Sequence, residues 1–318
     1  MVDPVLKWAG GKRQLLDELV ARFPASFATY HEPFVGGGAV FFALEPDRAR
    51  INDTNPRLVN FYEQVRDRPA ELIERLESYR DPAADTDGAR AFADTDRDGD
   101  PVGDYYYQQR ALFNRRSNGE SFDPVEEAAL FLYLNRTCFN GLYRENADGE
   151  FNVPVGRYAD PDWVRRDRIR DASRVLDGVT VTDRDFEAVL DSSDPGDGPD
   201  AGGSPDPGDL VYCDPPYEPM SPTADFTEYS ASGFDRADQE RLVRVARDLD
   251  ERGVHVVLSN SGITCDRYEA AGFFVERVGA TRAINSDADN RDEVDEMIAT
   301  GVPPGERRGR SQSSLGEF

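Results

Sequence analysis

Apolar residues follow two different spacings along the chain, one typical of buried strands and the other of helices. Short runs of apolar and β-branched residues predict strands at 50–53, 179–182, 210–213, 254–260, 273–278 and 294–300. Apolar residues recur every three or four positions at 13–23, 58–79 with a break at Pro69, 105–116, 125–134 and 234–252. Residues 30–42 indicate a further strand that leads through a glycine turn into a helix. Strands that alternate with helices predict an α/β fold with a parallel sheet.

The strand predicted at 210–213 (LVYC) ends in a motif that points to chemistry. Pro215 and Pro216 cannot donate hydrogen bonds to a sheet, so the strand stops and Asp214 is expected at its carboxyl end. Open α/β sheets bind ligands at this edge. A carboxylate, proline carbonyls without a competing N–H and the ring of Tyr217 suit a flat heterocycle with an exocyclic amine. The alternative is an acidic cap of the Pro-Pro turn above a packed tyrosine.

Two further strand ends fit a nucleoside cofactor. Glycines 36–38 follow the strand that begins near residue 30, and they allow a ligand to approach the backbone closely. Asp53 ends the strand at 50–53, about where dinucleotide folds place a ribose-binding acid. No Walker lysine accompanies the glycines, so a triphosphate is not indicated. The alternatives are a structural glycine turn and an Asp53 that caps the helix beginning near Asn55.

Asp185 and Phe186 follow the strand predicted at 179–182. An acid and an aromatic residue at the carboxyl end of a strand suit an adenine ring. They suit the start of a helix equally well, and the sequence leaves both readings open.

Charge is distributed unevenly in this chain. It has 62 acidic and 37 basic residues, a formal net charge of −25, and its only lysines are Lys7 and Lys12. A surface rich in acids and nearly free of lysine suggests a protein that stays folded in concentrated salt, so we hypothesise a halophilic cytoplasm. The two lysines flank a double glycine at 10–11, before the helix predicted at 13–23. We expect them to donate to a carboxylate or a base edge; the alternative is a plain turn with both lysines in solvent.

Residues that mark other classes of protein are sparse. Cys138, Cys213 and Cys265 have no paired spacing, and His31 and His255 lie far apart, so neither a disulfide framework nor a metal site is expected. The amino-terminal residues lack the apolar core of a signal peptide, and no apolar run reaches the length of a membrane span. These features predict a soluble cytoplasmic protein without a membrane partner.

The stretch 134–158 is rich in asparagine, arginine and aromatic residues. Predicted turns at Asn140-Gly141, Asp148-Gly149 and Val155-Gly156 divide it, which indicates a hairpin-like recognition loop. Residues 105–170 contain ten arginines and ten acidic residues, so the excess negative charge lies outside this segment. A neutral segment in an acidic protein is where a polyanion could dock. The alternative is a structural hairpin whose arginines pair with nearby acids.

Polar segments between the predicted elements indicate loops. Residues 81–104 are expected to be a surface insertion, 191–208 a disordered loop and 301–318 a loose tail. Residues 226–230 (FTEYS) are a candidate lid over the site that Asp214 marks.

Four motifs occur in the order found in the Dam family of DNA adenine methylases: KWAGGK at 7–12, EPFVGGG at 32–38, the asparagine-rich stretch at 135–158 and DPPY at 214–217. The chain resembles this family from Leu6 to about Thr300. The resemblance implies a class I, S-adenosylmethionine-dependent methyltransferase with a Rossmann-like doubly wound sheet. Residues 1–69 and 161–300 would form this discontinuous core. Residues 70–160 would form a mainly helical target-recognition region with a hairpin at 135–158.

The resemblance also implies an activity and a set of site residues. The activity is site-specific transfer of a methyl group to the 6-amino group of a flipped adenine in double-stranded DNA, and a monomer is expected to perform it. Asp214, Pro215 and Tyr217 would hold the adenine. The cofactor would contact Trp8, Lys12, Phe34, Gly36, Gly38, Asp53, Asp185 and Phe186, with Asp53 accepting from the ribose hydroxyls. DNA would contact Lys7, Arg136, Phe139, Asn140, Leu142, Arg144, Asn146, Pro154 and Tyr158.

The core of the hairpin suggests a recognition sequence. Residues 140–144 (NGLYR) look like those of family members that read GATC, which we therefore predict as the site. Arg144 would read a guanine by two parallel hydrogen bonds, and Phe139 or Leu142 would wedge between base steps.

Two features depart from the family, and other activities stay open. Ser261 stands where many members have a histidine, and the acidic segment 285–296 replaces a more basic one. An amino-methyltransferase that acts on RNA or a protein amide would use a similar turn. A DNA-binding regulator that no longer turns over is disfavoured by the intact motif at 214–217. A nicotinamide dehydrogenase is disfavoured because no stretch supplies a hydride-handling partner.

Overall fold

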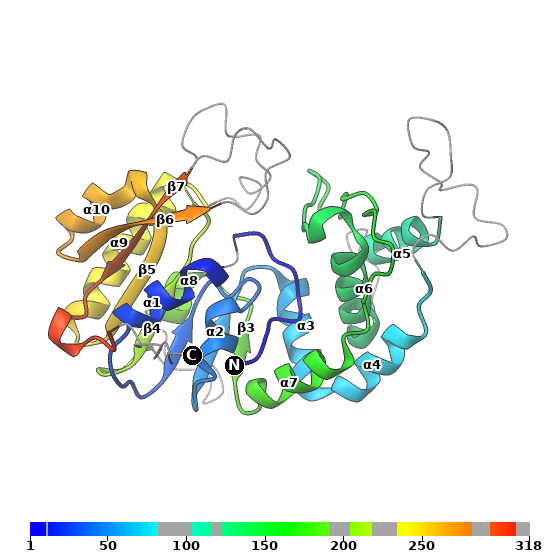
Figure 1. The fold of residues 1–318 in the computed structure, drawn as a ribbon, viewed down its shortest axis with the longest axis horizontal. Coiled ribbons are helices and arrows are strands. Elements are labelled where there is room, and N and C mark those ends of the chain that lie inside the picture. The colour runs from blue at the N-terminus through cyan, green and yellow to red at the C-terminus, as the bar shows by residue number, and fades with distance from the viewer. Residues whose placement is uncertain are drawn as a thin grey trace, which may run out of the picture. The chain divides into compact units, whose positions relative to one another are not determined.

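The chain folds into two units, which the computed structural model describes over residues 1–10, 12–81, 104–115, 122–190, 204–217, 234–281 and 293–309. Unit 1 comprises Met1–Gly11, Gly36–Glu45 and Thr54–Asp183, and unit 2 comprises Lys12–Val35, Pro46–Asp53 and Arg184–Phe318. Figure 1 shows the helices and strands of each unit. Each unit draws on three stretches of the sequence, so neither is one continuous segment.

Unit 2 is built on a mixed sheet. It contains six of the seven strands found in the described residues: β1 Tyr30–Glu32, β2 Ala49–Asn52, β4 Leu210–Cys213, β5 His255–Ser261, β6 Phe274–Thr281 and β7 Glu293–Thr300. They lie in the order β2-β1-β4-β5-β7-β6. β1 pairs in parallel with β2 and β4, and β4 with β5, whereas β7 runs antiparallel to β5 and β6. The predicted α/β architecture is confirmed.

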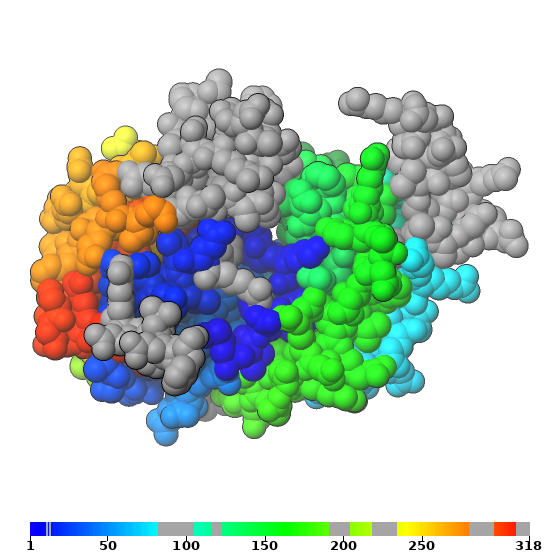
Figure 2. Space-filling view, in the orientation of Figure 1, coloured from blue at the N-terminus to red at the C-terminus, as the bar shows by residue number. Residues whose placement is uncertain are grey.

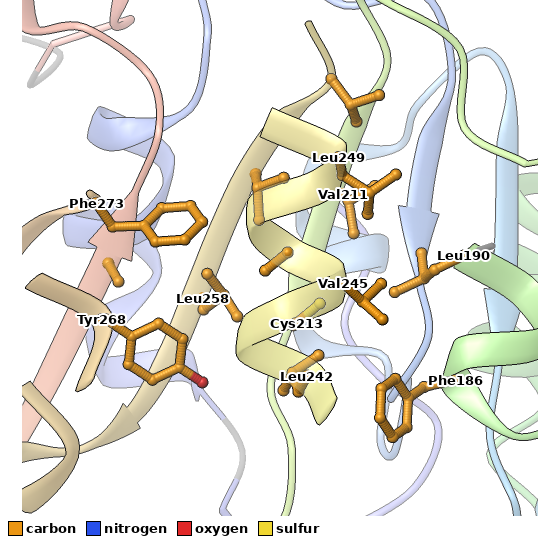
Figure 3. Packing of buried hydrophobic residues seen from close by; sticks show 14 of the residues in the cluster. Phe186, Leu190, Val211, Cys213, Leu242, Val245, Leu249, Leu258, Tyr268 and Phe273 are labelled. Atoms are coloured by element: carbon orange, nitrogen blue, oxygen red, sulfur yellow. The ribbon is translucent and has the colours of Figure 1, made fainter. Parts of the chain in front are cut away.

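The central strands of this sheet are buried, as their continuous apolar runs predict. All four residues of β4 and all but the first of β5 are buried. Helix α9 (Arg236–Glu251) covers one face, and Figure 3 shows its Leu242 and Val245 beside Val211 of β4 and Leu258 of β5. Tyr268 extends the same apolar core. Burial of this surface fixes the strands, and therefore the residues that follow their carboxyl ends.

Helix α9 begins at a capping box, and the other helices of unit 2 are short. Before α9, the side chain of Asp235 accepts from the N–H of Asp238, and the Asp238 side chain accepts in return, which forms a capping box. The helix predicted at 13–23 begins as a 3-10 turn before it becomes α-helical. The short elements are η1 Lys12–Leu15, α1 Leu16–Arg22, α8 Phe186–Leu190, η6 Gly262–Thr264, α10 Cys265–Ala270 and η7 Pro304–Glu306.

Unit 1 is mainly helical. Its elements are α2 Ala39–Leu44, α3 Pro56–Asp67, α4 Pro69–Glu77, α5 Asp104–Asn114, α6 Pro124–Thr137, η3 Phe139–Gly141, α7 Arg166–Leu176 and β3 Thr180–Thr182. The predicted break at Pro69 is confirmed, because α3 ends two residues earlier and Pro69 opens α4, where its missing N–H is not needed. Helix α6 is buried along most of its length, which fits its apolar composition on every face.

The start of the predicted tail is held in place, contrary to the sequence expectation. The N–H of Arg308 donates to the carbonyl of Phe23 at 2.9 Å, and the N–H of Ala25 donates to the carbonyl of Glu306 at 3.0 Å. Residues 301–309 therefore return to the end of α1. Their polar composition predicted a loop, but it carries no information about backbone partners.

The end of the loop predicted at 191–208 is also ordered. The guanidinium of Arg252 donates to the carbonyl of Pro205, and the hydroxyl of Ser204 donates to the carbonyl of Leu190. The other expected loops lie outside the described residues, namely 82–103, 191–203, the candidate lid at 226–230, most of the acidic segment at 285–296 and the tail at 310–318.

The buried His31 of β1 predicts a pH dependence of stability. Its Nε2 lies 3.0 Å from Oδ2 of Asp209, and burial lowers the pKa of His31 from 6.5 although Asp209 opposes the change. The imidazole of His31 therefore binds a proton more readily in the unfolded chain than in the folded protein, so the free energy of unfolding should fall as the pH drops. His31→Gln keeps a donor for Asp209 but cannot titrate. Urea unfolding at about pH 7.5 and about pH 5.5 should show that the free energy of unfolding falls more in the wild type than in His31→Gln. Equal decreases in the two proteins would contradict this prediction.

Candidate functional site

Asp214 lies at the carboxyl end of β4, directly after the buried strand. Its Oδ1 accepts a hydrogen bond from the hydroxyl of Ser259 on β5 at 2.9 Å, and that hydroxyl lies 2.8 Å from the Tyr212 hydroxyl. Oδ1 also lies 3.0 Å from Nζ of Lys12. Among the described residues, Oδ2 has no partner, and the side chain is 21% exposed. One carboxylate oxygen is therefore anchored, while the other can accept from a ligand.

Lys12 places a buried positive charge beside two carboxylates. Its side chain is 6% exposed, and Nζ lies 3.9 Å from Oε2 of Glu296 in addition to its ion pair with Asp214. Nζ also lies 4.6 Å from the centre of the Tyr217 ring. The expectation that Lys12 meets a carboxylate is confirmed, and the alternative of a lysine in solvent is wrong for this residue.

Tyr217 is oriented by Glu296, a residue that the sequence analysis missed. The Tyr217 hydroxyl donates to Oε2 of Glu296 at 3.0 Å. Burial, together with the negative charges of Asp214 and Glu296, raises the pKa of Tyr217 well above 10.0, so the phenol stays protonated and can donate. Glu296 reaches this position because β7 pairs antiparallel with β5, with Glu296 opposite Ser261. The sequence predicted both strands but not their pairing.

A buried relay of side-chain amides holds the Pro-Pro turn. Nε2 of Gln239 on α9 donates to the carbonyl of Pro216 at 3.0 Å, and Nδ2 of Asn260 donates to Oε1 of Gln239 at 3.0 Å. Asn260 also donates to the Tyr268 hydroxyl at 3.4 Å. The Pro216 carbonyl is therefore occupied. No described residue donates to the carbonyl of Pro215, which leaves it as an acceptor beside Asp214.

This relay predicts a stability effect. We expect Gln239→Ala to lower the free energy of unfolding by about 1–3 kcal/mol, because the buried amide of Asn260 and the Pro216 carbonyl lose a partner. Glu240→Ala, at an exposed neighbouring position of α9, should change it by less than about 0.5 kcal/mol. Urea unfolding of both variants measures the difference. Equal values would show that the relay contributes nothing to stability.

An aromatic cluster follows β1 in the same unit. The ring centres of Phe34 and Phe186 are 5.4 Å apart, and Phe234 lies 5.6 Å from Phe34. Asp185 caps α8 by accepting from the N–H of Glu187 at 2.9 Å, and it pairs with Arg241 at 2.6 Å. Asp185 therefore accepts at the start of α8, as a helix cap does, and its contact with an adenine stays a prediction.

Asp53 follows β2, and the helix-cap reading of this residue is wrong. The side chain of Asn55 accepts from the N–H groups of Arg57 and Leu58, and so caps α3 itself. The preceding residue, Asn52, bonds both the N–H and the carbonyl of Arg184, which joins the end of β2 to the segment before α8. Asp53 is thus positioned by β2 without serving as the cap.

In unit 1, Trp8 packs against the glycine turn at 36–38. A Cβ at Gly36 would stand 2.9 Å from Nε1 of Trp8, and one at Gly37 would stand 2.6 Å from its Cβ. Gly36 and Gly38 have φ angles of 46° and 70°, which favour glycine. Trp8 also stacks on Tyr143 with ring centres 5.7 Å apart. Gly36 and Gly37 are thus needed for close packing of a tryptophan, which the sequence alone did not predict.

The hairpin predicted at 135–158 begins later than expected, because residues 135–137 form the last turn of α6. Bridges join Cys138 to Val155 and Glu145 to Phe151 in antiparallel orientation. Asn146 organises the turn, since its Oδ1 accepts from the N–H groups of Asp148 and Glu150. Asn146 therefore stabilises this turn. The exposed residues among the predicted DNA contacts are Phe139, Asn140, Asn146 and Pro154.

The remaining predicted contacts are partly held by neighbours. Nε of Arg144 donates to Oδ1 of Asn152 at 2.6 Å, and Nζ of Lys7 donates to the Tyr158 hydroxyl at 3.1 Å. Arg136 is half-buried, which lowers its pKa. The hairpin belongs to the green part of the surface in Figure 2. Phe139 is 47% exposed. Lys7 contacts Tyr158 and Gly141, so these residues come together within unit 1.

No group of His, Cys, Asp and Glu side chains within the described ranges could hold a metal ion. No helix in those ranges is long and apolar enough to cross a membrane.

Comparison with known proteins identifies the family. The model for D12 class N6 adenine-specific DNA methyltransferases matches residues 8–284. The chain is 37% identical over 300 residues to the type II methyltransferase M1.LlaDCHI of Lactococcus lactis subsp. cremoris, covering 93% of this chain and 94% of that protein. It is 37% identical over 302 residues to M.MjaIII of Methanocaldococcus jannaschii, covering 91% and 95%. It is 34% identical over 300 residues to the DNA adenine methylase of Escherichia coli K12, covering 94% and 95%. The chain therefore belongs to the D12 class of N6 adenine-specific DNA methyltransferases.

Proposed function

We propose that this adenine-specific DNA methyltransferase takes the methyl group from S-adenosylmethionine and places it on the 6-amino group of adenine within GATC. The observation that carries the proposal is the Asp214 carboxylate, which has Oδ1 anchored and Oδ2 available at the carboxyl end of β4. The relatives named DNA adenine methylase support the same substrate. The hairpin core at 140–144 supports GATC.

Asp214 and Pro215 would prepare the amine for attack. The lone pair of an aromatic amine is delocalised into the ring, which makes adenine a poor nucleophile. If Oδ2 of Asp214 and the Pro215 carbonyl accept both amine hydrogens, the nitrogen can become pyramidal and direct its lone pair at the methyl donor. Ser259 and Lys12 hold the other carboxylate oxygen, so the acceptor does not have to reorganise as charge develops. The nitrogen then releases one proton to solvent.

Tyr217 would supply the aromatic face for the extruded base. Its ring is fixed by the hydrogen bond of its hydroxyl to Glu296 and by the ammonium of Lys12 above it. Extrusion of a base costs a few kcal/mol, which contacts at the hairpin must offset. Positioning of the amine against the donor would supply much of the rate.

The residues present fit S-adenosylmethionine, which supplies a methyl group on a positively charged sulfur. Unit 2 offers groups of the right chemistry, with carboxylates for ribose hydroxyls and aromatic rings for the adenine. Asp53 suits the ribose, because it follows β2 directly at the carboxyl end of the strand. Phe34 suits the adenine, because it stands in an aromatic cluster at the end of β1. We propose that Trp8, Lys12, Phe34, Gly36, Gly38, Asp53, Asp185 and Phe186 hold this cofactor.

The target-recognition region is proposed to be 70–160, and the catalytic core 1–69 with 161–300. Within the recognition region, the exposed ring of Phe139 at the start of the hairpin suits insertion between base steps. Arg144 would read a guanine, with Leu142 beside it. Lys7, Arg136, Asn140, Asn146, Pro154 and Tyr158 complete the proposed contacts with double-stranded DNA.

A methyl-transfer assay tests the proposed substrate. Purified protein would be given labelled S-adenosylmethionine and a duplex with one GATC, the same duplex already methylated on both adenines, or a structured RNA of matching sequence. We expect label on the unmodified duplex alone. Transfer to RNA, or equal transfer to the premethylated duplex, would overturn the proposal. Cofactor binding without any transfer would favour an idle regulator.

We also propose that the chain is adapted to concentrated salt. Its net charge of −25 implies strong self-repulsion, which salt screens. Circular dichroism after dialysis from about 2 M to about 0.05 M KCl should show loss of helical signal, because the Debye length grows several-fold over this range. An unchanged spectrum and melting temperature would contradict the adaptation.

A further inference from the structure

Asn135 ties the amino-terminal segment to the recognition hairpin. The N–H of Lys7 donates to its Oδ1 at 2.9 Å, and its Nδ2 donates to the Lys7 carbonyl at 2.7 Å. Nδ2 also donates to the carbonyl of Gly141 at 3.1 Å. One side-chain amide thus pairs with both peptide groups of Lys7 and with Gly141, at the start of the hairpin, at the same time. The residues before Lys7 form no helix or strand of their own.

The side chain of Lys7 is guided along the hairpin. A Cβ at Gly141 would stand 2.5 Å from Cδ and 2.6 Å from Cβ of Lys7, so the lysine passes directly over this glycine. The ammonium then donates to the Tyr158 hydroxyl at 3.1 Å and lies 4.2 Å from the centre of its ring. A flexible lysine is therefore fixed at its backbone, along its chain and at its charged end.

The environment of Asn135 indicates that its amide is kept for this contact. Asn135 is 3% exposed on α6, where most of its buried neighbours are apolar. Packing alone would be satisfied by an apolar residue at this position. A buried amide is costly unless it is hydrogen-bonded, and three of its bonds go to Lys7 and Gly141.

We infer that Asn135 is a positioning residue for sequence recognition, which holds Lys7 against Gly141 at the start of the hairpin so that both meet DNA as one rigid unit. The inference rests on the proposed function, because that proposal assigns Lys7 and the hairpin to DNA. Reading a base edge requires a donor at a defined place, and a long lysine chain does not provide one without support. Asn135 would act through Lys7 and not touch DNA itself.

The test compares discrimination rather than overall activity. Methylation rates would be measured for the wild type, Asn135→Asp, Asn135→Ala, Lys7→Ala and Arg144→Ala, on a GATC duplex and on duplexes with each base pair changed in turn. Asn135→Asp keeps the shape of the side chain but replaces Nδ2, which donates to the carbonyls of Lys7 and Gly141, with an oxygen that cannot donate. Asn60→Ala is the matched control, since Asn60 also bonds a backbone carbonyl in unit 1, that of Pro124 at 2.9 Å.

We expect Asn135→Asp and Lys7→Ala to lose discrimination at the same base pair, by about tenfold or more, and to retain it where Arg144→Ala loses it. A double variant of Lys7 and Asn135 should discriminate no worse than Lys7→Ala, because the two act as one unit. Asn60→Ala should leave the methylation rate on GATC, relative to the rate on the changed duplex, unaltered at all four base pairs. If the Asn135 variants do not fold, Gly141→Ala, which crowds the lysine, should give the same pattern.

Two results would overturn the inference, and they can be told apart. If Asn135 variants slow methylation equally on every duplex while Lys7→Ala loses discrimination at one base pair, Asn135 is merely structural. If Lys7→Ala loses discrimination at no base pair, the proposed role of Lys7 is itself wrong, and the inference is overturned together with it.

Discussion

Asp214→Ala is expected to reduce the rate of methyl transfer by about 100-fold to 1,000-fold, while binding of S-adenosylmethionine changes little. The variant removes the acceptor at Oδ2, so the adenine nitrogen keeps its lone pair in the ring. It does not alter Phe34 or Asp53, the proposed contacts of the cofactor. Single-turnover kinetics and calorimetric titration with the cofactor would measure the two effects separately.

The structure also specifies the controls for this variant. Asp214 lies 3.0 Å from the buried ammonium of Lys12, and Glu296 lies 3.9 Å from it, so removing Asp214 also changes the stability of the folded protein. Asp214→Asn keeps the volume, and thermal unfolding of both variants reports on folding. Asp248→Asn, at an exposed position on α9, should behave as the wild type. Near-normal turnover by a folded Asp214→Ala would refute the assignment.

Arg144→Ala is expected to slow methylation of GATC by about 5-fold to 150-fold and to relax specificity at one base pair. A guanidinium that reads guanine by two hydrogen bonds contributes about 1–3 kcal/mol of discrimination. The side chain is oriented for such a role by Asn152, which accepts from its Nε. Leu142→Ala should also slow methylation, because it removes the proposed apolar wedge between base steps.

Salt separates base reading from phosphate contacts. Affinity that comes from phosphates falls with salt, by a slope of about 0.9 per neutralised phosphate, whereas base contacts persist. We therefore expect Arg144→Ala to remain damaging in high salt, and Arg165→Ala, outside the hairpin, to cost less. Arg170→Ala is the control, because its side chain is 62% exposed. A loss from Arg165→Ala equal to that from Arg144→Ala would contradict the proposal.

Local sequence patterns predicted much of the fold and one half of the site. The continuous apolar run at 210–213 and the two prolines after it fixed the end of β4, and so the place of Asp214. The retention of lysine at position 12 predicted a carboxylate or a base edge as its partner, and Asp214 is such a carboxylate. The first inference uses neighbours in the sequence, where backbone chemistry restricts the chain strongly. The second uses the scarcity of lysine in the whole chain.

The other half of the site depends on contacts between distant segments. Glu296 reaches Tyr217 only because β7 inserts between β5 and β6, and Gln239 reaches Pro216 only because α9 packs on the sheet. Nothing in the spacing of residues 294–300 specifies that strand order. The packing of Trp8 on the glycine turn, and the return of residues 301–309 to α1, likewise depend on tertiary contacts.

The assignment of Asp214 to methyl transfer is tested by mapping methylated positions in DNA from cells that express this chain. Cells without methylases of their own would carry the wild type or Asp214→Ala at equal protein levels. We expect N6-methyladenine at GATC on both strands with the wild type, and a much smaller methylated fraction with the variant. Methylation of another base or sequence, or equal methylation by a folded Asp214→Ala, would contradict the assignment.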